Sequence, residues 1–316
     1  MTPPYTTQLE LCMRRISCTL MLFSIFGVNK AVAEFSCPQD SIPVKHAVAA
    51  AKFCQEKNFD AARKEIDLAM QVDTEKDEVY TWYIRGFIFK EIYKTSESHD
   101  RNSASREEAT SSFLYSKKLV REQGSEYNND AALKFLASTY YNDALISASD
   151  FDIKDEMQGE NQLQKFVDIS RKIDPASRTE TSEREYYKVR GQRYLTLWSA
   201  DTCNRALSEK ALASYGNALL KGEPDCDMIY NMAIIHYNIY VHASYEGSCY
   251  TQEEGTLHVN DALQRLTEAE RICPEKIEVI SALQNLYRAT GDLERANQYG
   301  NKLNTLIGRT PGTEKQ

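Results

Sequence analysis

The sequence predicts an all-α protein built from about six consecutive helix pairs. Only 13 Gly and 8 Pro occur in 316 residues, and alternating Val, Ile and Thr runs are scarce, so helices are favoured over strands. A motif of the form aromatic-x-β-branched-Arg-Gly-x-x-aromatic occurs twice. A second spacing recurs along the chain, in which an Ala is followed four positions later by a bulky residue and three positions after that by a small one. These spacings place side chains on one helix face and predict repeated helix-on-helix packing.

The beginning of the chain has the pattern of a targeting signal. Met13-Arg14-Arg15 is basic, Ile16 to Val28 is uncharged and mostly apolar, and Ala31-Val32-Ala33 matches a cleavage site. We expect a signal peptide at residues 1–33, with Met13 as a possible start, and a short lead-in at 34–42. The alternative is that this apolar segment is a helix of the protein core. Whether the signal segment is cleaved or retained as a membrane anchor stays open. The signal predicts export to a periplasm or outside the cell, with no membrane span once it is removed.

The first two pairs are expected to begin near residues 43 and 79. In the first, Ala50 and Phe53 precede Asn58, and the small-residue spacing follows at Ala62, Ile66 and Ala69. In the second, the duplicated motif is Trp82 to Phe89, followed by Ala109, Phe113 and Ser116. Gly86 lies inside this expected helix, where glycine costs about 1 kcal/mol relative to alanine. Its presence predicts a neighbouring helix packed closely against the backbone.

The remaining pairs are expected to begin near residues 130, 184, 227 and 277. Tyr187 to Tyr194 is the second copy of the duplicated motif, with Gly191 in the place of Gly86. The other expected first helices have similar spacing, at Leu133-Leu136-Ala137-Tyr140, Tyr230-Ala233-Ile234-Tyr237 and Ile280-Leu283-Tyr287. Expected second helices contain Ala211-Tyr215-Ala218 and Ala262-Leu266-Ala269, and the last pair turns at Gly291-Asp292 before Ala296.

This alternation resembles the tetratricopeptide repeat (TPR), whose first helix carries W-x2-L-G-x2-Y and whose second carries A-x3-F-x2-A. The resemblance covers residues 43–307 and implies an α-solenoid of stacked pairs. An irregular helical bundle is the alternative. Polar insertions at Lys94–Glu107, Ala148–Asn161 and Ser244–His258 are expected to be loops. The tail, 308–316, is expected to be disordered.

The resemblance also implies a pairing for the cysteines, because it places Cys203 and Cys249 on one edge of the stack and Cys226 and Cys273 on the other. We therefore expect the disulfides Cys203–Cys249 and Cys226–Cys273, with Cys37–Cys54 near the beginning of the chain. Six cysteines allow 15 connectivities, and free buried thiols are the alternative, especially for Cys54.

Several functions are disfavoured by the sequence. A net charge of −8 and the lack of a basic stripe argue against nucleic-acid binding. No catalytic motif is found, so an enzyme is not expected, and no cofactor is implied. The acidic stretch Asp73–Glu78 is expected to be a solvated turn. Zinc ligation is the rival hypothesis for His236, His242, Cys249 and His258. Their spacing does not resemble a C-x2-C or H-E-x-x-H site, so no metal site is predicted.

The resemblance implies that first helices line a concave surface that binds a protein or an extended peptide. We therefore predict an exported binding scaffold, with envelope assembly or secretion as the process it would serve. A glycan or small-ligand module is the alternative, and an unrecognised helical enzyme is a further one. The oligomeric state is left open. The expected contact residues are Tyr83, Phe87, Lys134, Ser138, Tyr141, Lys188, Gln192, Asn231, Ile235, Asn238, Asn285 and Arg288.

Overall fold

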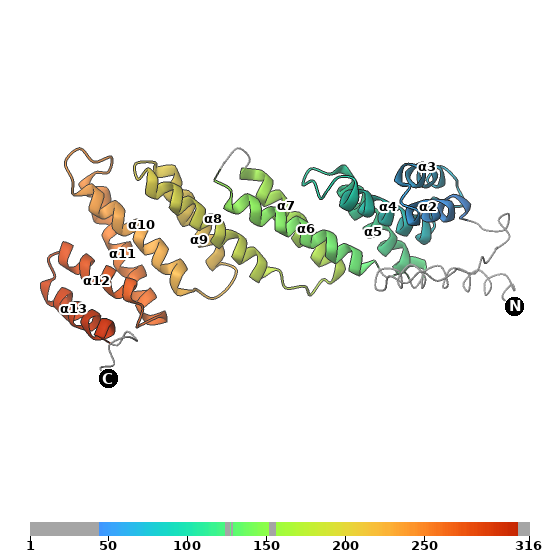
Figure 1. The fold of residues 1–316 in the computed structure, drawn as a ribbon. Helices are drawn as coiled ribbons and strands as arrows, with labels where there is room; N and C mark the ends of the chain where they lie inside the picture. Colours follow the sequence, from blue (N-terminus) through green and yellow to red (C-terminus); the bar gives the residue numbers. More distant parts are fainter. Residues whose placement is uncertain (1–43, 124–126, 128, 152–155, 309–316) are drawn as a thin grey trace, which may run out of the picture. The chain divides into compact units, whose positions relative to one another are not determined.

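The computed structural model describes residues 44–123, 127, 129–151 and 156–308. The expected signal peptide (1–33), the lead-in (34–42) and the tail after Gly308 lie outside the described residues. Within the described part the structure contains twelve helices and no strand (Figure 1). No helix in that part is both long and apolar enough to cross a bilayer. The predicted all-α class is confirmed.

The helices follow one another as six pairs, each consisting of a first helix, a turn or loop and a second helix (Figure 1). The first helices begin at or near the predicted residues 43, 79, 130, 184, 227 and 277. The pairs are α2 (Lys45–Gln55) with α3 (Phe59–Ala69), α4 (Val79–Thr95) with α5 (Ala104–Gln123), α6 (Asp130–Ser149) with α7 (Glu156–Ile173), α8 (Glu180–Ala200) with α9 (Arg205–Leu219), α10 (Cys226–Ala243) with α11 (Gln252–Ile272), and α12 (Ile277–Ala289) with α13 (Leu293–Gly308).

The chain divides into two compact units, 1–136 and 137–316, with the division inside α6. In the first unit, α2 packs against α3 and α4 packs against α5, and α4 also contacts α2 and α3. In the second unit, α8 pairs with α9, α10 with α11 and α12 with α13, and α10 contacts α8, α9 and α12. Each unit is therefore a stack in which neighbouring pairs share apolar surface, as a repeat fold requires.

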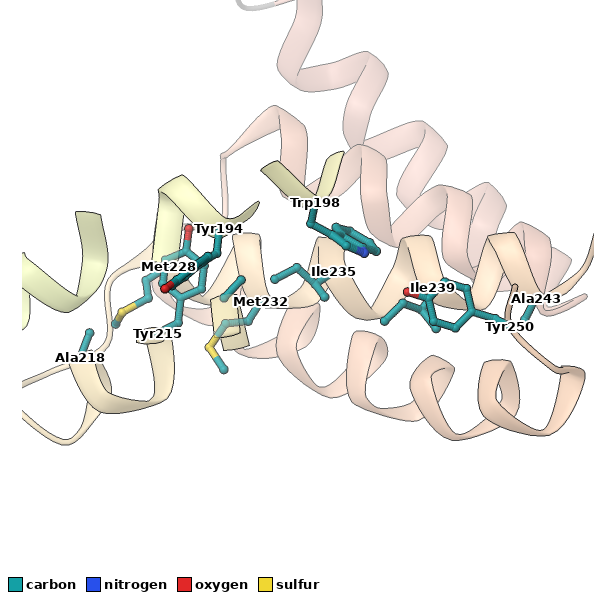
Figure 2. Close-up of a cluster of buried hydrophobic side chains, with 11 residues drawn as sticks. Tyr194, Trp198, Tyr215, Ala218, Met228, Met232, Ile235, Ile239, Ala243 and Tyr250 are labelled. Atoms are coloured by element: carbon teal, nitrogen blue, oxygen red, sulfur yellow. The ribbon is translucent and has the colours of Figure 1, made fainter. Parts of the chain in front are cut away.

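One core of the second unit is shared by three helices (Figure 2). Tyr194 and Trp198 come from α8, Tyr215 from α9, and Met232 and Ile239 from α10, and none of these side chains is more than 4% exposed. Burial of side chains this large contributes about 2–3 kcal/mol each. The core therefore joins the α8–α9 pair to the first helix of the next pair.

Glycines mark the closest helix contacts, as the duplicated motif predicted. A Cβ atom placed on Gly86 would lie 2.8 Å from three ring atoms of Phe113 on α5, and one on Gly191 would lie 2.9 Å from ring atoms of Tyr215 on α9. At Gly255 on α11 the added Cβ would lie 2.6 Å from the Cβ of Ala243. Only a residue without a side chain permits helix backbones to approach neighbouring side chains so closely.

The three expected insertion loops are shorter than predicted, because much of each belongs to a second helix. The second helix begins inside each expected insertion, α5 at Ala104, α7 at Glu156 and α11 at Gln252. Local capping explains two of the early helix starts. The Ser103 hydroxyl accepts a hydrogen bond from the Arg106 N–H at 2.9 Å, and Thr251 forms a reciprocal capping box with Glu254. A Thr-x-x-Glu pattern signals a helix start even when the residues that follow are polar.

Glu75 departs from the expected solvated turn at 73–78. Its side chain is 3% exposed and accepts hydrogen bonds from the backbone N–H groups of His46, at 3.1 Å, and Ala47, at 3.0 Å. These donors lie in the first turn of α2, whose own N-cap residue, Val44, makes no side-chain cap. A carboxylate from a later turn therefore caps this helix, an arrangement that local spacing does not reveal.

Candidate binding surface on the first helices

The structure places the predicted contact residues in three classes of exposure. Five are exposed, namely Lys134, Ser138, Gln192, Asn285 and Arg288, and five are half-buried, namely Phe87, Tyr141, Lys188, Asn231 and Asn238. Tyr83 and Ile235 are buried, at 6% and 0% exposure. The last two cannot offer free contact area, so those two expectations are wrong.

Tyr83 is buried by an aromatic cluster in the first unit. Its ring centroid lies 5.1 Å from that of Tyr127, 4.9 Å from Phe87 and 6.2 Å from Phe113. Edge and tilted contacts of this kind stabilise a core beyond the area they bury. Tyr127 follows α5 in the sequence, and the sequence pattern gave no sign that its ring covers the first-helix face.

Ile235 is buried because the register of α10 differs by one residue from the predicted one. Ala233 is fully buried in the core that includes Leu266 of the paired helix α11, whereas Ile234 is half-buried at the edge of that core. A shift of one residue rotates a helix face by about 100°, and this turns Ile235 towards α8 and α9. In Figure 2 it lies near Trp198 and Met232 in the shared core.

Charged side chains from α8 meet at the start of α10. The Lys188 Nζ atom lies 3.0 Å from Asp225 Oδ2, and the Arg184 Nη2 atom lies 3.2 Å from the same oxygen. Asp225 also caps α10 by accepting the Met228 N–H at 2.8 Å. Burial opposes its ionisation, but the hydrogen bond from Met228 and the charges of Lys188 and Arg184 outweigh burial and lower the pKa of Asp225. Two cations therefore share one carboxylate here.

Next to this charged group, two predicted residues are held by a buried tyrosine. The Asn231 Nδ2 atom donates to Gln192 Oε1 at 2.9 Å and to the Tyr215 hydroxyl at 3.1 Å, and the Tyr215 hydroxyl donates to Gln192 Oε1 at 3.2 Å. Tyr215 itself is 0% exposed. The two amides come from the first helices of adjacent pairs, and the hydroxyl beneath them comes from α9. Lys188, Gln192 and Asn231, with Arg184 and Asp225, are called the α8–α10 surface below.

The other contact candidates lie elsewhere on the first helices. Tyr141 is in the second-unit part of α6, where its ring centroid lies 5.0 Å from that of Phe166, and burial raises its pKa. Asn238 lies two turns after Asn231 on α10, and Asn285 and Arg288 are exposed on α12. Asn238, Asn285 and Arg288 do not join the hydrogen-bonded group of the α8–α10 surface.

Disulfides join the cysteines at both edges of the α8–α11 region. Cys203 follows α8 and Cys249 precedes α11, with Cα atoms 5.7 Å apart, and the Cys249 carbonyl accepts a 2.6 Å hydrogen bond from Arg205. Cys226 begins α10 and Cys273 follows α11, with Cα atoms 6.0 Å apart. Both Cα separations suit a disulfide. Cys54 has no disulfide within the described residues, and its expected partner Cys37 lies outside them.

Two of the four histidine and cysteine residues weighed as zinc ligands are in contact. His236 Nδ1 on α10 lies 2.7 Å from His258 Nδ1 on α11. The Asp261 carboxylate, one turn after His258, lies 3.8 Å from His236 Nδ1. His242 is separate, with its ring 6.4 Å from that of Tyr245, and Cys249 is in a disulfide. The sequence analysis did not foresee this contact or the place of Asp261.

The packing within the helix pairs resembles that of the TPR. In two pairs a small residue of the first helix lies against the aromatic residue of the second, at Gly86–Phe113 and Gly191–Tyr215, which is the arrangement that the TPR motif encodes. The helix pairs are TPR-like.

Comparisons with known proteins give distant structural similarities. No family model matches the sequence, and no curated protein matches it. Among solved structures, the MamA protein has a TM-score of 0.35 at 17% identity, covering 72% of this chain and 97% of its own. The TPR2AB-domain:pHSP90 complex of yeast Sti1 has a TM-score of 0.29 at 14% identity, covering 86% and 93%. Yeast Tom70 has a TM-score of 0.25 at 11% identity, covering 95% and 68%.

Proposed function

We propose that this protein is an exported scaffold that binds an extended segment of another protein along the α8–α10 surface. The observation that supports this most directly is the unused hydrogen-bonding capacity of two amides. Gln192 receives both of its side-chain bonds at Oε1, and Asn231 uses only Nδ2. Among the described residues, Gln192 Nε2 and Asn231 Oδ1 have no partner. The pair therefore offers one donor and one acceptor, which complements the C=O and N–H of a peptide unit.

The neighbouring charges suggest which side chain the bound segment carries. Arg184 and Lys188 both contact the single carboxylate of Asp225, so this end of the surface retains a positive charge. An acidic side chain close to the bound peptide unit would complement it and gain charge-assisted hydrogen bonds. We therefore infer a preference for extended segments with an Asp or Glu near the main-chain contact.

A rigid support favours binding over catalysis at this surface. Tyr215 positions both amides from a fully buried site, and the adjacent Gly191 fixes the separation of α8 and α9. Amides held by a packed core lose little rotamer freedom when a ligand binds, which favours affinity. The glycan alternative draws less support, because Tyr140 and Tyr194 are core residues with 0% exposure and cannot stack on a sugar.

Export is the second part of the proposal. It is supported by the targeting pattern at 1–33 and by the two cysteine pairs, because disulfides persist in oxidising compartments. Mass spectrometry of protein recovered from the cells that make it, digested without reduction, tests this part. We expect a mature N-terminus at Glu34 and linked peptides joining Cys203 to Cys249 and Cys226 to Cys273. A retained N-terminus together with free thiols at these positions would overturn export and leave the binding proposal to its own test.

Site-specific photo-crosslinking tests the binding part. A photoreactive residue in place of Gln192, which is exposed on α8, is expected to capture a partner in cells. The matched control places the same residue at Glu209, which is exposed on the second helix α9. Equal capture at both positions, or capture at Glu209 alone, would contradict a first-helix binding surface.

A further inference from the structure

The side chains of His236, His258 and Asp261 form a cluster between α10 and α11 that neither the repeat packing nor the proposed binding surface uses. Their potential ligand atoms all lie within 4.8 Å of one another. His236 is largely enclosed, with its side chain 12% exposed, whereas the Asp261 side chain is 56% exposed. The cluster therefore has one side anchored in the helix pair and one side open to solvent.

The helix geometry explains why these residues meet. Gly255 allows α11 to approach α10 closely, because a Cβ there would lie 2.6 Å from the Ala243 Cβ. His258 and Asp261 lie three and six residues after Gly255, on one side of α11. His236 lies seven residues, about two turns, before Ala243 on the antiparallel helix α10. The close contact at Gly255 thus brings the imidazole rings together, with their centroids 5.0 Å apart.

We propose that His236, His258 and Asp261 bind a divalent transition-metal ion of the Zn²⁺ class. Two imidazoles and one carboxylate form a ligand set that such ions prefer, and Mg²⁺ and Ca²⁺ take oxygen ligands instead. In a tetrahedral site with bonds of about 2.1 Å, ligand atoms lie about 3.4 Å apart. The observed separations of 2.7 Å between the two Nδ1 atoms and 3.8 Å between His236 Nδ1 and Asp261 Oδ2 lie on either side of that value, so small side-chain rotations suffice.

A change of tautomer suits the two rings to metal binding. With both rings neutral, the 2.7 Å contact between the two Nδ1 atoms requires that one Nδ1–H donates to the other Nδ1. Moving that proton to Nε2 of the same ring frees both Nδ1 lone pairs. Binding at pH 7 then requires a change of tautomer in one ring and no net release of protons from the two imidazoles.

Three protein ligands leave a fourth coordination position for water or for a group of an incoming molecule. Structural zinc sites have four protein ligands, whereas sites with three keep an open position. Because Asp261 faces solvent, the open position is accessible. The cluster lies on the α10–α11 pair rather than on the α8–α10 surface, so this inference does not depend on the proposed peptide binding.

The test uses the full chain with its disulfides intact, stripped of metal by a chelator and titrated with Zn²⁺ or Co²⁺. We expect one strong site per chain by competition with a chromogenic zinc indicator, and a Co²⁺ absorption spectrum of nitrogen and oxygen ligation. Thiolate ligation by a free cysteine would add an intense near-ultraviolet band, so the spectrum separates the two sources. His258→Gln is expected to abolish the site, and Asp261→Asn is expected to weaken it by at least about 10-fold.

Matched controls keep the test decisive. His242→Gln removes an imidazole from the same helix α10, and Glu268→Gln removes a carboxylate from α11, and neither belongs to the cluster. Both should bind Zn²⁺ as the wild type does. Asp261 is exposed, so Asp261→Asn is expected to leave the helical circular dichroism unchanged. Absence of binding at micromolar Zn²⁺, or binding that survives both His258→Gln and Asp261→Asn, would overturn the proposal.

Discussion

Replacing Gly191 with alanine separates the packing role of this residue from the ordinary cost of a helical glycine. A Cβ at Gly191 would lie 2.9 Å from two ring atoms of Tyr215 and 3.1 Å from a third. The ring cannot move away freely, because it is fully buried and its hydroxyl is bonded to Gln192 and Asn231. Overpacking of this kind costs about 1–3 kcal/mol, and the gain in helix propensity offsets about 1 kcal/mol of it.

The matched control is Gly216→Ala in the paired helix α9. Apart from the adjoining backbone of α9 itself, no atom lies within 4 Å of a Cβ placed there, so only the propensity gain of about 0.5–1 kcal/mol remains. The difference between the two variants cancels the propensity term and leaves the packing term. We therefore expect Gly191→Ala to unfold about 1–3 kcal/mol more easily than Gly216→Ala.

The assay is urea denaturation followed by Trp198 fluorescence in a Trp82→Phe background. Trp198 belongs to the same core as Tyr215, so its emission reports on the α8–α10 region, and circular dichroism follows the whole chain. If Gly191→Ala were stabilised as much as Gly216→Ala, the close helix contact would not exist in solution. The TPR-like interpretation of the duplicated motif would then be wrong.

Three further perturbations follow from particular contacts. Replacing Cys203 and Cys249 together with serine is expected to lower the free energy of unfolding by about 2–4 kcal/mol, measured by urea denaturation without reductant. Glu75→Gln removes the carboxylate at the start of α2 and should cost about 1–2 kcal/mol, measured as a lower midpoint of unfolding. Although burial opposes ionisation of Glu183, hydrogen bonds from Lys221 and Thr179 lower its pKa below the ordinary 4.5. Its contribution is thus present above pH 4.5 and lost as the pH falls through the lower folded value, so Glu183→Gln should flatten the acid side of the stability profile.

Each of these has its own control. Reductant should destabilise the wild type but have a smaller effect on the double serine variant, and equal loss in both would exclude a role for the Cys203–Cys249 bond. Glu78→Gln alters a carboxylate in the same turn that makes no side-chain cap and should change the midpoint little. A Glu183→Gln profile that still falls as steeply as the wild type below pH 4.5 would assign the acid sensitivity to other carboxylates.

The sequence predicted the helix pairs well because their signals are local. Spacings of three and four residues identify a helix face, and Gly86 and Gly191 mark contacts that no other residue permits. The pairs Cys203–Cys249 and Cys226–Cys273 were implied by the resemblance to the TPR, because in a stack of helix pairs the residues that follow successive first helices, or successive second helices, lie at the same edge.

The parts that the sequence did not predict depend on non-local contacts. Nothing near Val44 indicates that Glu75 caps α2, and nothing near Tyr83 indicates that Tyr127 covers it. The register of α10 differs by one residue because Ala233 and Ile234 both satisfy the spacing, and only the full burial of Ala233 in the core shared with α11 distinguishes them. The helix start at Thr251 was recognisable from its Thr-x-x-Glu pattern, but the polar residues that follow resembled a loop.

Binding of extended peptides to the α8–α10 surface is the most direct test of the central claim. Fluorescence polarisation of a labelled peptide library, with and without acidic residues, would be measured on the wild type, Gln192→Ala, Asn231→Ala and the control Glu209→Ala. We expect acidic extended peptides to bind, each amide variant to weaken binding by about 3- to 10-fold, and Glu209→Ala to bind as the wild type does. Equal affinity in all four proteins, or no peptide binding by the wild type, would contradict the account.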